Sequence, residues 1–210
     1  MSEDLIFYTN PQSRGRIVRW MLEEVGVPYK TVVLAYDADM KAAHYLAINP
    51  MGKVPAITHN GNVITEVAAI CAYLADMFPG AELLPRTAEE KANYYRWFFF
   101  AAGPLEAALS NKAVFRQKPE AEKERTLGYG NYENTLNTLS LAVTANPFIA
   151  GEHFTAADVY VGSHIGWGMQ FGTLEKWDAF VDYFARLQQR PALKRAAELD
   201  DALVEKASET

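Results

Sequence analysis

The sequence predicts a small α/β domain followed by an all-helical domain. Strand-like and helix-like segments alternate through residues 4–78, whereas residues 87–210 show helical patterns and no convincing strand. The stretch "GAELLPR" between them has the composition of a linker. Alternating strands and helices are typical of a layered α/β domain, and helices alone are typical of a separate helical unit. We therefore expect domains over residues 1–80 and 87–210.

The first domain opens with a β-rich run, "DLIFYT", and a helix follows it. In that helix apolar residues recur on one face from Ile17 to Val25, and Gly26 ends it. A second strand is expected in "PYKTVVLA", and a short helical turn around "KAAHYLAI". Because a helix separates the two strands, we expect them to pair in parallel.

A hairpin and a helix complete the predicted α/β domain. Asn60-Gly61 is a strong turn signal and divides "KVPAITHNGNVIT" into two strands. Val54-Pro55 lies inside the first of them, where proline removes a hydrogen-bond donor from the sheet. Local sequence leaves two interpretations open, an edge strand or a cis peptide that frees the Val54 backbone for a ligand. "EVAAICAYLADMF" follows as a helix that a Pro-Gly pair ends.

The second domain is a predicted series of helices. Its boundaries are marked by capping boxes, by prolines and by a Gly-Pro pair. The expected features are, in chain order, a capping box at 87–90, a kink at Gly103-Pro104, a helix from Pro119 toward Val143, a second box at 155–158, and two amphipathic segments separated at Arg190-Pro191.

Composition excludes several classes of function. The formal net charge of -6 and the pI near 5.3 argue against a nucleic-acid surface, which needs a basic face. The single cysteine, Cys71, excludes a disulfide framework within the chain and a cysteine-type zinc site, and the four histidines show no metal-ligand spacing. No apolar run approaches the roughly 20 residues that span a bilayer, and "MSEDLIFY" is not a signal peptide. We expect a cytoplasmic protein without metal, nucleic acid or membrane as partners.

Three motifs together resemble the cytosolic glutathione transferases. They are "NPMGKVPAI", "TEVAAICAYLAD" and "AGEHFTAADV"; each alone is weak, but their order and separations are specific and the resemblance covers nearly the full chain. It implies a thioredoxin-like first domain, a cis Val54-Pro55 bond and a homodimer. It also implies a bacterial-type enzyme of detoxification that conjugates its co-substrate glutathione to small hydrophobic electrophiles. The alternatives are a glutathione-dependent peroxidase or isomerase, and a non-catalytic glutathione-binding interaction module.

The resemblance assigns glutathione-binding roles within the first domain. Lys53 would meet the glycine carboxylate, and Val54, before Pro55, would exchange main-chain hydrogen bonds with the cysteinyl part. Glu66 would hold the γ-glutamyl end, where the family pattern is glutamate-serine and this chain has Val67 in the serine's place. Losing one hydroxyl hydrogen bond weakens that grip by about 1 kcal/mol. Without the motif, Lys53 reads as a solvated lysine and Glu66 as an acid favoured by a helix dipole.

Three side chains compete as the hydrogen-bond donor to the glutathione thiol. In serine-type branches of the family a proline-x-serine after the first strand carries this donor, and Pro11-Gln12-Ser13 matches that pattern. Tyrosine-type branches use a tyrosine at the end of that strand, and Tyr8 lies near this place. Asn10 is a third donor. Ser13 also suits a purely structural helix cap; we expect it to be the thiol donor.

Charges near Ser13 suggest further stabilisation of a thiolate. The helix amino terminus and the arginines of "SRGRIVRW" could favour a bound anion, although three arginines on one helix are usually solvated. The resemblance places the electrophile against the helical domain. Most aromatic side chains there must be core, and only Phe100 and Trp167 are expected to touch it. Cys71 is expected to be a buried structural thiol, and Thr155 and Asp158 to have structural roles.

Overall fold

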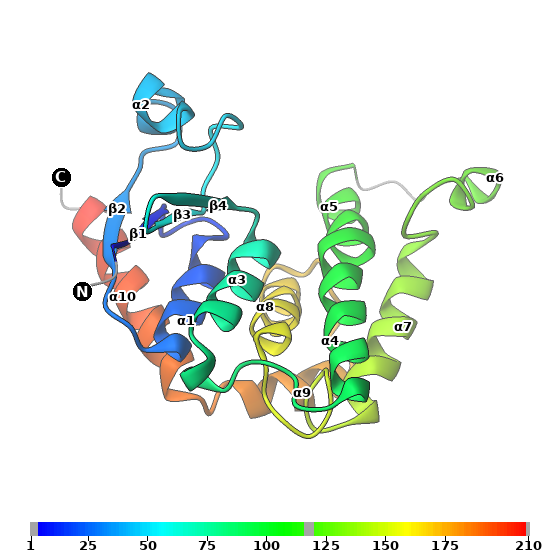
Figure 1. Ribbon diagram of the computed structural model, residues 1–210. Helices are drawn as coiled ribbons and strands as arrows, with labels where there is room; N and C mark the ends of the chain where they lie inside the picture. Colours follow the sequence, from blue (N-terminus) through cyan, green and yellow to red (C-terminus); the bar gives the residue numbers. More distant parts are fainter. Residues whose placement is uncertain (1–3, 116–119, 209–210) are drawn as a thin grey trace. The chain divides into compact units, whose positions relative to one another are not determined.

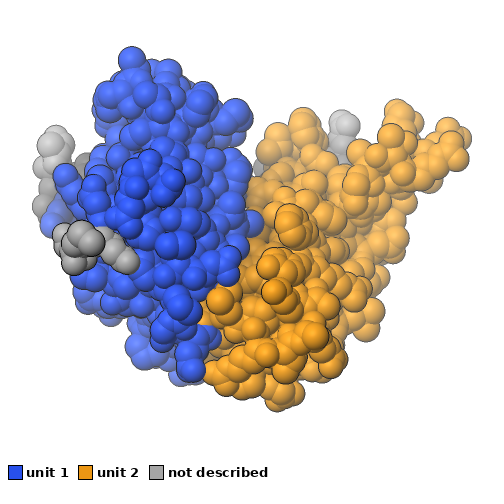
Figure 2. All heavy atoms as spheres, in the orientation of Figure 1, with its two compact units in different colours: residues 1–82, 189–210 blue, residues 83–188 orange. Residues whose placement is uncertain are grey.

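The computed structural model describes residues 4–115 and 120–208. Their contacts define two compact units, coloured separately in Figure 2. Unit 1 combines the chain up to Glu82 with the chain from Gln189 onward, and unit 2 is Leu83–Gln188. The sequence assigned everything after residue 87 to one helical domain, whereas the last helix of the structure packs within unit 1.

Unit 1 is built on a four-stranded mixed sheet in the order β2-β1-β3-β4 (Figure 1). The strands are β1 (Leu5–Thr9), β2 (Lys30–Val33), β3 (Ala56–His59) and β4 (Asn62–Thr65). β1 pairs in parallel with β2 and antiparallel with β3, and β3 pairs antiparallel with β4. The expected parallel pair and the expected hairpin are both confirmed, and the sheet is of the thioredoxin-like kind.

The β3–β4 hairpin forms at the expected Asn-Gly pair. Asn60 and Gly61 have φ angles of 49° and 84°, as a type I′ turn requires. The expectation that Pro55 lies inside a strand is wrong, because β3 begins at Ala56 and the proline precedes the sheet. The Val54-Pro55 peptide is cis, as the resemblance implied.

Four helices complete unit 1: α1 (Gly15–Val25), α2 (Ala43–Leu46), α3 (Val67–Met77) and α10 (Pro191–Ser208). Short 3-10 turns lie at Asp39–Lys41 and Pro79–Ala81. α1 packs against both α3 and α10. Along β1, Leu5, Phe7 and Thr9 are buried while the residues between them are half-buried, so one face of the strand lies in the main core.

Among the described residues of unit 2, the regular elements are all helices, joined by turns and loops. They are α4 (Ala88–Phe100), a π-helical turn (Ala101–Leu105), α5 (Glu106–Val114), α6 (Ala121–Glu124), α7 (Tyr132–Ala145), α8 (Ala156–Phe171) and α9 (Asp178–Leu187). The π turn contains Pro104, where the sequence predicted a kink, because proline removes the hydrogen bond that would continue α4.

The single helix expected from Pro119 toward Val143 is wrong in its described part, and Pro119 itself lies outside the described residues. Two helices, α6 and α7, occupy this region. The break falls before Asn131, where Gly130 has a φ of 65° and the Asn131 side chain accepts a hydrogen bond from the N–H of Asn134. A left-handed glycine ends a helical path, and the asparagine caps the next one.

Asp158 anchors the amino end of α8 in a structural role, as expected. Its buried carboxylate accepts hydrogen bonds from the N–H groups of Ile149 (2.7 Å) and Thr155 (2.8 Å) and from the hydroxyl of Tyr183 (2.7 Å). Burial raises the pKa of Asp158 to about 6, although these hydrogen bonds favour the charged form. Within the described part of the chain, every helix is too short or too polar to cross a bilayer.

Candidate functional site

Asn10 fixes the turn that joins β1 to α1. Its side-chain amide donates to the Leu34 carbonyl at 2.9 Å, and its side-chain oxygen accepts from the N–H of Gln12 at 2.9 Å. The amide therefore ties the turn to the end of β2 and shapes the turn internally. Asn10 is thus engaged on both sides by the protein itself, which makes it a structural element of this loop.

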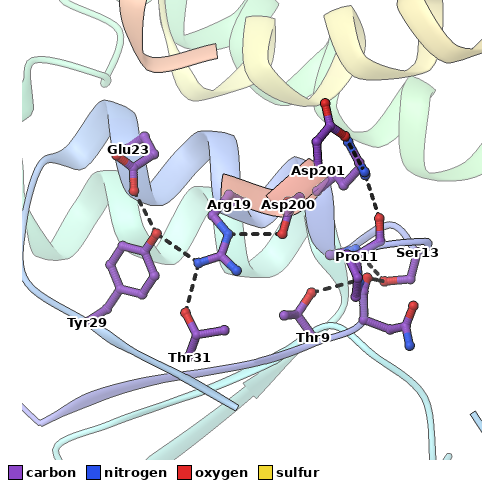
Figure 3. Close-up of polar contacts among 12 residues, drawn as sticks. Thr9, Pro11, Ser13, Arg19, Glu23, Tyr29, Thr31, Asp200 and Asp201 are labelled. Carbon is purple, nitrogen blue, oxygen red and sulfur yellow. Dashed lines mark hydrogen bonds and ion pairs between the residues drawn. The ribbon is translucent and has the colours of Figure 1, made fainter. Parts of the chain in front are cut away.

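The Ser13 hydroxyl lies at the amino end of α1 and faces its own chain (Figure 3). It donates to the Asn10 carbonyl at 2.7 Å and accepts from the N–H of Gly15 at 2.9 Å. The Ser13 hydroxyl therefore caps α1, because it accepts the hydrogen bond of the main-chain N–H of the first helical residue. Gly15 is packed tightly there, since an added Cβ would overlap Oγ1 of Thr9.

Tyr8 lies in β1 with its side chain on the face opposite Phe7. The half-buried ring packs against a small cluster of Leu34, Met40 and Tyr45, and its centroid lies 5.7 Å from that of Tyr45. Its hydroxyl makes no hydrogen bond with any residue that the structure describes. The side chains of Asn10 and Ser13 both hydrogen-bond within the protein, so of the three candidate donors Tyr8 is the one least engaged by it.

Carboxylates of α10 pair with both arginines of α1, Arg16 and Arg19. Arg19 is 3% exposed, and its guanidinium makes three polar contacts (Figure 3). The partners are Asp200 at 3.2 Å, Tyr29 at 3.0 Å and Thr31 at 2.8 Å. Arg16 pairs with Asp201 at 2.7 Å. The suggestion that these guanidinium groups act on an anion next to Ser13 is therefore not supported for Arg16 or Arg19, because α10 carboxylates engage both.

The main chains of Lys53 and Val54 differ in how the protein uses them. The Lys53 carbonyl is held from inside by the Tyr45 hydroxyl at 2.6 Å and the Asn49 side-chain amide at 2.8 Å. The main-chain groups of Val54 make no hydrogen bond with any described residue. The Lys53 side chain is exposed. An extended peptide can therefore pair with Val54 beside a cationic side chain.

Glu66 occupies a backbone conformation that is unfavourable for a side chain. It joins β4 to α3 with a φ of 65°, and no side chain caps the amino end of α3. Such outliers cost about 1–3 kcal/mol and cluster where ligands are held. The Glu66 side chain is exposed, whereas Val67 is 9% exposed and faces the protein. The free amino end of α3 suits a bound carboxylate.

These groups lie in one unit with a recognisable chemistry: an open strand-like backbone, an exposed lysine, an uncapped helix end and a hydroxyl-bearing loop. A family model described as "Glutathione S-transferase, N-terminal domain" matches residues 13–77. The chain is 30% identical over 185 residues to glutathione S-transferase A of Pleuronectes platessa, which covers 83% of this chain and 82% of that protein. It is 29% identical over 155 residues to glutathione S-transferase GstA of Escherichia coli O157:H7, covering 72% and 76%.

The chain belongs to the glutathione S-transferase family. The fold agrees with solved structures. A glutathione transferase from Methylococcus capsulatus superposes with a TM-score of 0.76 at 24% identity, over 94% of this chain and 99% of that one. A glutathione transferase family member from Pseudomonas fluorescens with two glutathione molecules bound gives a TM-score of 0.71 at 25% identity, over 92% of each chain.

The two residues that we expect to contact the electrophile, Phe100 and Trp167, lie in unit 2. Phe100, at the end of α4, is half-buried and packs edge-on against Trp97 with ring centroids 5.5 Å apart. Trp167, on α8, is also half-buried. Both rings keep accessible surface while most aromatic side chains around them are core, and their contact with a substrate stays a prediction.

Cys71 is a buried structural thiol in this glutathione S-transferase, as expected. It is fully buried on α3, and burial raises the pKa of its thiol. A thiol with a raised pKa is a poor nucleophile. Within residues 4–115 and 120–208, no group of three or more histidine, cysteine or acidic side chains is arranged to hold a metal ion.

Sequence reasoning missed the residues that support the site from behind. Tyr45 and Asn49 fix the Lys53 carbonyl, and burial raises the pKa of Tyr45 to about 12, so its hydroxyl stays a donor. Asn49 could have been predicted from the sequence, because it opens the "NPMGKVPAI" motif. The Arg19–Asp200 pair could not have been predicted, because its members are separated by 181 positions and no local pattern links them.

Proposed function

We propose that the protein is a glutathione transferase that holds glutathione along unit 1 and uses its thiolate to attack small hydrophobic electrophiles. The observation that supports this best is the unpaired main chain of Val54 between an exposed lysine and the uncapped end of α3. Family membership gives the chemical class of the ligand.

Glutathione would lie extended across this edge of unit 1. Its glycine carboxylate would pair with Lys53, and its cysteinyl part would exchange main-chain hydrogen bonds with Val54 beside Pro55. The γ-glutamyl end would meet Glu66 and the free N–H groups that start α3, with Val67 supplying only its main chain. A charged residue at each end and main-chain pairing at the centre suit a zwitterionic tripeptide.

The thiolate would be stabilised at the amino end of α1 by Ser13. A free thiol has a pKa near roughly 8.5, and lowering it by about two units requires about 2.7 kcal/mol of preference for the anion. In this role the Ser13 proton turns from the Asn10 carbonyl to the sulfur, while the N–H of Gly15 still bonds to the hydroxyl oxygen. The helix dipole adds to the effect. Tyr8, with its unused hydroxyl, is the main rival donor and Asn10 the second.

The reaction needs no covalent protein intermediate. The thiolate sulfur forms a bond to an electrophilic carbon, the leaving group departs with the electron pair, and the protein contributes positioning and anion stabilisation. Phe100 and Trp167 would contact the apolar electrophile. A glutathione-dependent peroxidase or isomerase would use the same thiolate, and a binding module would hold glutathione without turnover.

Immobilised glutathione and a chloronitrobenzene test the function directly. We expect retention of the protein by the matrix, elution by free glutathione, and conjugation of the chloronitrobenzene. Retention without turnover of electrophiles or peroxides would support the interaction module instead. Failure of the folded protein to bind the matrix would overturn every glutathione function.

Matched hydroxyl deletions identify the donor. Ser13→Ala is expected to raise the apparent pKa of bound glutathione, measured from thiolate absorbance, with little loss of affinity. Tyr8→Phe, which also removes one hydroxyl, is expected to leave that pKa unchanged. The opposite pattern would assign the thiol to Tyr8 and make Ser13 a cap only.

A further inference from the structure

Ion pairs between described residues join α1 to the carboxyl-terminal segment of the chain. As positions in α1 increase, the partner positions decrease, so the two segments run antiparallel. The pairs are Arg16–Asp201 at 2.7 Å, Arg19–Asp200 at 3.2 Å, Glu23–Arg195 at 2.8 Å and Glu24–Arg190 at 2.6 Å. Only the first of them reaches the loop before α1.

Arg16 connects that loop to α10. Its Nη2 pairs with Oδ1 of Asp201, and its Nε donates to the main-chain carbonyl of Pro11 (Figure 3). Pro11 lies between the two loop residues, Asn10 and Ser13, whose side chains are candidate thiol donors. A carboxylate of the last helix is therefore linked, through one side chain, to the peptide group in the middle of the thiol loop.

We propose that Asp201 is a positioning residue for the glutathione reaction, acting through Arg16 and the Pro11 carbonyl. This inference rests on the proposed placement of the thiol at this loop. The guanidinium is planar and its N–H directions are fixed relative to one another, so a carboxylate on one edge also aims the Nε–H. The Pro11 carbonyl belongs to a planar peptide, and holding it fixes the turn that directs Ser13.

Exposure separates this role from a contribution to folding. The Asp201 side chain is 62% exposed and that of Arg16 is 27% exposed. Ion pairs at such exposure contribute little to stability. The pair therefore has a small effect on the fold, whereas a small error in thiol placement strongly affects the rate.

The test compares Asp201→Ala and Asp201→Glu with Arg195→Ala. Arg195, 66% exposed, pairs with Glu23 on the same two helices but away from the loop, so its removal is a matched control. We expect Asp201→Ala to lower kcat/KM for glutathione about tenfold. We also expect it to raise the apparent pKa of the bound thiol by about one unit. Asp201→Glu should restore most of both, and urea unfolding of Asp201→Ala should match that of Arg195→Ala.

Two results would overturn the inference. One is an unchanged pH–rate profile for Asp201→Ala, equal to that of Arg195→Ala. The other is a lower thiol pKa in Asp201→Ala, which would mean that the released Arg16 acts on the sulfur directly. Failure of the unaltered protein to bind immobilised glutathione would instead overturn the proposed function, so the two failures are distinguishable.

Discussion

Asp158 holds a carboxyl group inside unit 2 where no solvent reaches it. Its pKa is raised from 3.8 to about 6, so the folded protein binds this proton more tightly than the unfolded chain does. For such a group the free energy of unfolding is greatest below the unfolded pKa and falls as the pH rises through the folded one. The window is therefore about pH 4 to pH 6.

We predict that the stability advantage of the natural protein over Asp158→Asn shrinks by about 2.5 kcal/mol between pH 4 and pH 7. The asparagine has the same size but does not titrate, so the difference between the two proteins isolates this carboxyl. Urea unfolding across the pH series measures it. A constant difference would show that Asp158 is already charged at pH 4.

Ser13 shows how far sequence reasoning reaches for a single residue. The sequence predicted correctly that Ser13 lies at the amino end of a helix. Both interpretations, helix cap and thiol donor, are compatible with the sequence. The structure adds the bonds to Asn10 and Gly15, which depend on the path of the turn. No residue spacing encodes where a hydroxyl proton points, because rotation about one bond decides it.

The contact between α1 and α10 contains a buried ion pair that we expect to be important for the stability of unit 1. Arg19 and Asp200 are both buried there, and Oδ2 of Asp200 has no hydrogen-bond partner among the described residues. Burial raises the pKa of Asp200 although Arg19 favours its charged form. Such a pair is costly to form, but breaking it leaves a guanidinium charge buried without its carboxylate.

We predict that Asp200→Ala lowers the free energy of unfolding by about 3–5 kcal/mol. The adjacent Asp201→Ala, which removes a carboxylate at an exposed position, should cost less than about 1 kcal/mol. Denaturant unfolding of the two variants measures the contrast. Equal losses would mean that the Arg19–Asp200 pair contributes no more than a surface ion pair.

The ends of helices and strands were predicted best where one residue type dictates the backbone conformation. Asn60-Gly61 and Pro104 marked a turn and a helix interruption correctly. Proline also produced the clearest error, since Pro55 was placed within a strand that begins one residue later. The break between α6 and α7 was missed because glycine ends a helix only where it adopts a left-handed conformation, and the sequence does not show which glycines do so.

The division of the whole molecule could be predicted only in part. The hydrophobic pattern predicts the change from strands to helices near residue 80. It does not predict that α10 packs within unit 1, because that packing depends on pairs such as Arg19–Asp200, which form between distant segments. An amphipathic helix pattern states that one face is buried and not which unit buries it.

The assembly is predicted to be a homodimer, as the family resemblance implies. Tyr95 and Phe99 lie one turn apart on α4 and are 48% and 73% exposed, which suits an apolar interface. Phe99→Glu is expected to yield monomers of 23.5 kDa by sedimentation. Phe171→Glu, at a side chain that is 71% exposed on α8, is the control and should leave the dimer intact. A monomeric natural protein would contradict the prediction.

A crystal structure with bound glutathione tests the central claim most directly. We predict that the tripeptide exchanges main-chain hydrogen bonds with Val54 and that its sulfur lies within about 3.5 Å of the Ser13 hydroxyl at the amino end of α1. Glutathione bound elsewhere, or bound at Val54 with its sulfur directed away from that helix end, would contradict the account.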